Sequence, residues 1–156
     1  MITFETYRKA GTEIDINNLL GIACNKTINS QADAVLHFLE QMDTEMLNDI
    51  LHDDRTYQDF PKHVFIQKLD GAFEDFKKAG DSLLSRYYGK CSEFGCNAGC
   101  EGFSFVGNKS GHYMDLIIEV KDGEVLDIYE CLKFNNLACR IGRNRRVCID
   151  KLNEIF

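Results

Sequence analysis

The feature that most constrains the fold is a pair of alternating apolar segments joined by Asp122-Gly123. Apolar residues occupy every second position from Met114 to Val120, a period of two that is typical of a β-strand with one buried face. An Asp-Gly pair favours a type I′ turn, because both central positions of that turn require positive φ. The segment therefore predicts a β-hairpin in which Lys121 lies opposite Glu124.

Counting outward from this turn predicts which side chains share a face of the sheet. The loop 108–111 closes a preceding hairpin, so the same counting applies there. The expected opposed pairs are Val120–Val125, Ile118–Asp127, Leu116–Tyr129, Phe105–Met114 and Phe103–Leu116. Both hairpins put one apolar set on one face, which predicts an antiparallel meander over residues 83–134 with its first strand near 83–88.

The first part of the chain, residues 1–82, is predicted to be mainly helical. Ser30 followed by Asp33 resembles a capping box, and apolar residues recur at helical spacing after it. A break is expected near Asp43-Thr44. Pro61 suits the first turn of another helix, and Gly80 suits its C-terminal end.

Helices followed by an antiparallel meander predict one α+β domain over residues 1–156, with helices packed on a curved sheet. Residues 135–156 form a C-terminal cap in this plan, with a candidate helix over 147–155. The element order across residues 30–134 resembles NTF2-like (cystatin-like) domains. The resemblance implies a cone with a pocket for a small-molecule ligand between sheet and helices, and dimerisation through the sheet. It implies no particular activity, because such folds host both enzymes and binding modules.

Charge and hydropathy restrict the partners of the chain. A net charge of −7 disfavours general nucleic-acid binding, because phosphates are repelled. No apolar run is long enough to span a bilayer, and no signal peptide is visible, so we expect a cytoplasmic protein without membrane contact. The one basic cluster is predicted to be a solvated turn or a contact for phosphate or an acidic partner; it comprises Arg140, Arg143, Arg145 and Arg146.

Seven cysteines are the most distinctive chemical feature of the chain. Cys91, Cys96 and Cys100 lie close together in a glycine-containing loop, residues 91–100, which predicts a structural zinc site. A tetrahedral site needs a fourth ligand, and the predicted register places Cys131 too far along the sheet. Twist or a bulge would change this distance, so Cys131 stays a candidate beside Cys139, Cys148 and His112. Two other interpretations stay open, a thiol-redox loop and unliganded thiols.

Asp127 and Tyr129 are the candidate catalytic residues. The predicted register puts Asp127 on the apolar face, where a buried carboxyl must find donors or keep a proton. In a pocket lined also by Phe105, the pair could perform general acid–base chemistry. The alternative is a carboxylate that reaches solvent or accepts a backbone N–H.

The sequence alone thus predicts a small cytoplasmic binding or accessory module whose cysteine loop holds a structural metal. A small pocket enzyme using Asp127 and Tyr129 (an isomerase, lyase or hydrolase) is one alternative, and a thiol-redox protein is the other. The sequence does not decide whether the protein is an enzyme.

Overall fold

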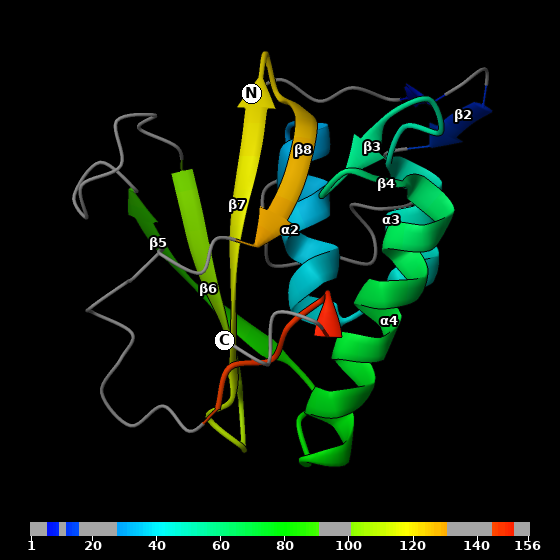
Figure 1. The fold of residues 1–156 in the computed structure, drawn as a ribbon. Helices are drawn as coiled ribbons and strands as arrows, with labels where there is room; N and C mark the ends of the chain where they lie inside the picture. The colour runs from blue at the N-terminus through cyan, green and yellow to red at the C-terminus, as the bar shows by residue number, and fades with distance from the viewer. Residues whose placement is uncertain (1–5, 10–11, 16–27, 91–100, 131–144, 152–156) are drawn as a thin grey trace.

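The computed structural model describes residues 6–9, 12–15, 28–90, 101–130 and 145–151, and each structural statement below concerns these residues. A four-stranded antiparallel sheet has the order β5-β6-β7-β8. Its strands are β5 (Leu84–Lys90), β6 (Glu101–Gly107), β7 (Tyr113–Lys121) and β8 (Glu124–Glu130). The sheet is not closed, so β5 and β8 are its two outer strands (Figure 1).

Three helices lie on one face of this sheet (Figure 1). They are α2 (Gln31–Gln41), α3 (Thr44–Ile50) and α4 (Lys62–Lys78). The structure also contains two small hairpins, β1 (Thr6–Lys9) with β2 (Thr12–Asp15), and β3 (Thr56–Tyr57) with β4 (Phe60–Pro61). The predicted α+β class is confirmed, whereas the β1–β2 hairpin was not anticipated from the sequence.

The helix boundaries follow from local capping. Ser30 Oγ accepts a hydrogen bond from Asp33 N at 3.1 Å, and Asp33 Oδ2 accepts one from Asn29 N at 3.1 Å. Met42, in the left-handed region at φ 55°, ends α2, and Asp43 Oδ1 then caps α3 by accepting from the N–H of the third helical residue at 3.0 Å. The bonds to Ser30 and Asp43 satisfy N–H groups that a helix start leaves without partners, and the bond from Asn29 fixes the residue before the first cap. They confirm the predicted cap and break.

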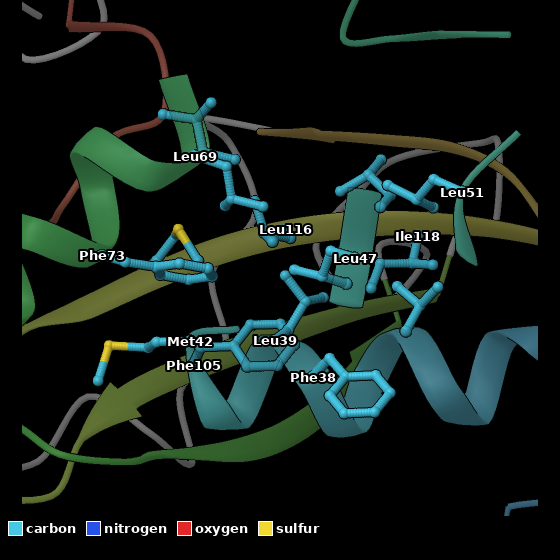
Figure 2. Close-up of a cluster of buried hydrophobic side chains, with 14 of the residues drawn as sticks. Phe38, Leu39, Met42, Leu47, Leu51, Leu69, Phe73, Phe105, Leu116 and Ile118 are labelled. Atoms are coloured by element: carbon cyan, nitrogen blue, oxygen red, sulfur yellow. The ribbon is translucent and has the colours of Figure 1, made fainter. Parts of the chain in front are cut away.

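The core lies between the helices and the inner face of the sheet. Figure 2 shows side chains from α2, α3, α4, β6 and β7 converging there. Fully or almost fully buried members include Phe38, Leu39, Leu47, Leu69, Phe73, Phe105, Leu116 and Ile118. Burying a large apolar side chain contributes roughly 1.5–3 kcal/mol, so this single cluster is the main source of stability in the described fold.

The predicted sheet register is confirmed in one hairpin and only in part in the other. Phe105 lies opposite Met114, and Phe103 opposite Leu116, as expected. The turn at Asp122-Gly123 has φ values of 53° and 80°, which agree with type I′ geometry. Val120 lies opposite Val125, as expected.

Beyond Val125 the predicted register was wrong. A β-bulge shifts the pairing between Glu119 and Val120, so Ile118 lies opposite Ile128 rather than Asp127. The bulge inserts one extra residue into β8, which turns Ile128 toward the core and keeps the Asp127 carboxyl out of it. Leu116 consequently lies opposite Glu130, and Tyr129 lies opposite Ile117.

The C-terminal segment 145–151 extends the sheet where β8 stops. Tyr113 N donates to Arg145 O at 2.9 Å, and Val147 N donates to Tyr113 O at 2.7 Å. Residues 147–150 are not helical and include a bend, whereas Lys151 lies in a 3₁₀ turn, so the candidate helix over 147–155 does not begin at Val147.

Arg146 holds this segment on the outer face of the sheet. Its guanidinium donates to Asp115 Oδ2 at 3.0 Å, and Asp115 Oδ1 accepts from Ser104 Oγ at 2.5 Å. Asp115 is buried, so the ion pair is screened much less than a surface pair. Arg146 therefore has a structural partner inside the chain, although Arg145 is exposed as the basic cluster predicted.

Candidate functional site

Asp127 anchors the β3–β4 hairpin to β8. Its Oδ1 accepts hydrogen bonds from Gln58 N at 3.0 Å and from Ile128 N at 2.8 Å. Burial raises the pKa of Asp127, and the carboxylates of Glu119 and Asp59 raise it further, while the two N–H donors oppose the shift. The carboxyl is thus satisfied by backbone N–H groups, which is the structural alternative to a catalytic role.

Tyr129 lies on the other face of the sheet from Phe105. Its hydroxyl donates to Glu119 Oε1 at 3.3 Å, whereas Phe105 is fully buried in the core. The structure therefore does not bring Asp127, Tyr129 and Phe105 around one pocket. Acid–base roles for Asp127 and Tyr129 stay a prediction from the sequence.

Substitutions at Asp127 show whether the fold needs its hydrogen-bond acceptor or its negative charge. We expect D127N to be at least as stable as the parent protein at pH 7, because Asn Oδ1 can accept both N–H bonds without a buried charge. D127A loses the acceptor and should cost roughly 1–2 kcal/mol. Because the folded pKa of Asp127 is raised, ionisation destabilises the fold as pH rises through that pKa, so any advantage of D127N should vanish in acid.

Urea unfolding of both variants at pH 7 and at acid pH measures these differences. If D127N were as unstable as D127A at pH 7, the carboxylate itself would be required and this interpretation would be wrong.

The β3–β4 turn holds two non-glycine residues in the left-handed region. Gln58 and Asp59 have φ values of 52° and 63°, a conformation that costs energy unless neighbouring groups fix it. The Gln58 side chain fixes it by bonding Glu130 twice: Oε1 accepts from Glu130 N at 2.8 Å and Nε2 donates to Glu130 Oε2 at 3.1 Å. Below this turn the Tyr57 hydroxyl accepts from His52 N at 3.1 Å, and burial raises the pKa of Tyr57 to about 12.

Side chains also form hydrogen bonds with the main-chain groups of β8 that lie nearer the Asp122-Gly123 turn. Val125 N donates to Gln31 Oε1 at 2.8 Å, and Val125 O accepts from Arg55 at 3.3 Å. Together with the bond from Glu130 N to Gln58, these contacts satisfy main-chain groups of β8 near both ends of the strand. Another strand could not pair with β8 without breaking them, so this edge of the sheet is protected against strand addition.

The opposite outer strand, β5, differs in that it carries exposed aromatic side chains. Tyr87 and Tyr88 are 42% and 49% exposed, and Leu83 just before the strand is 43% exposed. The exposed large apolar side chains of the described residues are Leu83, Tyr87, Tyr88, Val120 and Leu126, so residues 83–88 hold most of them. Aromatic side chains with an exposed face are enriched at protein interfaces, which makes β5 the candidate functional surface.

The predicted metal ligands cannot be placed. Cys91, Cys96 and Cys100 lie outside the described residues, between Lys90 and Glu101, which pair directly at the ends of β5 and β6. In the described ranges, no group of three or more His, Cys, Asp or Glu side chains could hold a metal ion. The zinc site therefore stays a prediction.

His112 is poorly placed as a fourth ligand. Glu101 begins β6 beside the cysteine loop, and Val106 near its far end pairs with Tyr113. Five residues of strand separate these levels, roughly 17 Å at 3.3–3.4 Å per residue. His112 precedes Tyr113 and lies at the far end of the sheet from the loop.

The other candidate ligands remain unassigned. Cys148 is 1% exposed in the C-terminal segment, where it is flanked by the buried residues Val147 and Ile149. Cys131 and Cys139 lie outside the described residues.

Comparisons with known proteins do not identify the chain. No helix in the described ranges is both long and apolar enough to cross a membrane. No family model, no curated protein and no solved structure matches the chain.

Proposed function

We propose that the protein is a non-catalytic binding module that pairs an extended polypeptide segment with β5. The observation that carries the proposal is the difference between the two outer strands. The main chain of β8 is bonded by Gln31, Arg55 and Gln58, whereas β5 presents exposed tyrosines beside an outer edge of the sheet. Strand addition uses main-chain bonds for affinity and alternate side chains for specificity.

The surroundings of the buried polar groups support binding over catalysis. Asp81, Asp115 and Gln31 are each buried and bonded to groups of the fold. Asp127 likewise accepts a hydrogen bond from the main chain of the fold.

A peptide-display experiment tests this function. The probe is a random library of linear peptides, panned against the immobilised protein at low surface density so that neighbouring copies stay apart. Selected peptides should bind several-fold more weakly to Y87K, because an edge lysine opposes strand addition. L126K is the matched control, an exposed apolar residue on β8 replaced by the same charge. Peptides that bind Y87K and the parent protein equally would refute the proposal.

The second part of the proposal is that residues 91–100 close the end of β5 and β6 around a structural zinc ion. It rests on the spacing of Cys91, Cys96 and Cys100 and on the direct pairing of Lys90 with Glu101. Protein never exposed to chelator should contain about one equivalent of zinc, and replacing Cys96 with serine should remove most of it. Less than about 0.3 equivalents of zinc or iron would contradict a metal site.

One observation favours the enzymatic alternative, the raised pKa of Asp127, because shifted carboxyls occur often at active sites. That alternative requires a ligand beside Asp127. The thiol-redox alternative requires two cysteines to disappear together in a thiol titration after mild oxidation. Both outcomes differ from those expected for peptide pairing at β5.

A further inference from the structure

We infer that the segment which pairs with β5 is β5 of a second copy, so that the protein is a dimer with an antiparallel β5–β5 seam around Tyr87. This inference rests on the proposed function. Among the described strands β5 pairs with β6 alone, and it ends the sheet at the side away from β8 (Figure 1). A two-fold axis through this edge joins two four-stranded sheets into one continuous sheet, and such symmetric interfaces are the commonest in oligomers.

The charges on β5 discriminate among the three registers centred on the middle of the strand, at Arg86, Tyr87 and Tyr88. Directly opposed residues must share a sheet face, so the two-fold axis passes through a residue rather than between two. An axis at Arg86 opposes Arg86 to its own copy, and an axis at Tyr88 opposes Arg86 to Lys90, a pair of like charges. Opposed like charges destabilise a sheet.

An axis at Tyr87 avoids both repulsions. It opposes Tyr87 to the second Tyr87 on the outer face, and Arg86 to Tyr88 on the inner face. Aromatic pairs and guanidinium–aromatic pairs are both favourable across strands. The exposed faces of Tyr87 and Tyr88 leave area to bury in these contacts.

Glu40 reduces the electrostatic repulsion between the β5 strands of two copies. The chain carries a net charge of −7, and β5 carries only basic charged residues. Arg86 Nε lies 3.4 Å from Glu40 Oε1 of α2, and Glu40 is largely buried. Glu40 thus offsets part of the Arg86 charge in each copy, so pairing of two β5 strands does not need a strongly acidic partner.

Sedimentation equilibrium of the full chain in reducing buffer tests the inference. The expected mass at micromolar concentration is twice the 17.8 kDa of one chain. Y87K should raise the dissociation constant by roughly tenfold or more, whereas Y87F and the control L126K should leave it close to the parent value. Circular dichroism verifies that each variant is folded.

Cross-linking tests the register. Opposed Cα atoms in antiparallel strands lie about 4.5–5.5 Å apart, within the range of about 4.4–6.8 Å that a disulfide spans. Y87C treated with oxidised glutathione should form a bond between the two introduced cysteines, identified by mass spectrometry against the background of native cysteines. S85C should form no bond to its own copy, because Ser85 lies opposite Gly89 in this register.

The outcomes separate the two proposals. A monomer at all concentrations, or a dimer unaffected by Y87K, overturns the inference. If such a monomer still binds display peptides in a Tyr87-dependent way, only the second copy as occupant is refuted. If display peptides bind independently of Tyr87, the proposed function itself fails.

Discussion

Replacing Gly107 with alanine should lower the free energy of unfolding by roughly 3 kcal/mol, because the new methyl group has no space. A Cβ on Gly107 would overlap Cγ and Oδ2 of Asp81 and stand 2.7 Å from Oδ1. Asp81 cannot move away cheaply. Its Oδ1 accepts from Lys109 N and Ser110 N at 2.8 Å each, and its Oδ2 accepts from Ser110 Oγ at 2.5 Å.

G71A is the matched control for this substitution. Gly71 lies within α4, and nothing lies within 4 Å of an added Cβ. Alanine there should stabilise the helix by about 0.5–1 kcal/mol, since glycine is unfavourable in a helix interior. Urea unfolding of the two variants should therefore give shifts of opposite sign. A G107A protein as stable as the parent would contradict the described packing of the β6–β7 turn.

The acid sensitivity of G107A provides a second readout. Burial alone would raise the pKa of Asp81, but hydrogen bonds from Ser110 and Lys109 and the nearby His112 lower it below its usual value. A lowered folded pKa contributes stability that is complete above the unfolded pKa of about 3.9 and is lost as pH falls through the folded pKa. Because G107A displaces Asp81, its stability should fall less steeply with pH in that acid range than the stability of the parent.

Replacing Gln31 with methionine should also cost roughly 3 kcal/mol, because two buried main-chain groups lose their partners. Gln31 is 3% exposed; its Nε2 donates to Ile50 O at 2.7 Å and its Oε1 accepts from Val125 N at 2.8 Å. It thus joins the end of α3 to β8. Methionine has similar length and flexibility, so the loss measures the two hydrogen bonds rather than a cavity.

Q67M is the control, because Gln67 is exposed on α4. Its free energy of unfolding should stay within about 0.5 kcal/mol of the parent value. Q31M should in addition open β8, whose amide exchange should accelerate near Val125. Equal stability of Q31M and Q67M would show that Gln31 does not secure this strand.

Much of the fold was predictable because the signals are local. Ser30 caps its own helix three residues on, and Asp122-Gly123 sets its own turn, so neither depends on distant residues. The bulge in β8 was missed although the residue types suggest it. Strict alternation from Val125 puts Asp127 on the core face, whereas one inserted residue puts Ile128 there. Burying an unpaired carboxylate costs more free energy than forming one bulge, so the bulged strand is the more stable arrangement.

The residues that protect β8 were not predictable from the sequence. Gln31, Arg55 and Gln58 bond residues that lie about 70 to 94 positions away, and none belongs to a recognisable motif. Their polar side chains are typical of solvated surface until the tertiary fold brings β8 beside them. The candidate surface on β5 was missed for a related reason, because the position of a strand within the sheet order follows from the assembled topology.

Amide hydrogen exchange of β5 tests the central claim most directly, because it reports main-chain pairing rather than burial of side chains. The measurement compares dilute with concentrated protein, and protein alone with a saturating display-selected peptide. Main-chain pairing predicts slower exchange at every second amide of Ser85–Gly89, with β8 unchanged. Unchanged exchange along β5 while the mass doubles or the peptide binds would contradict strand addition at this edge.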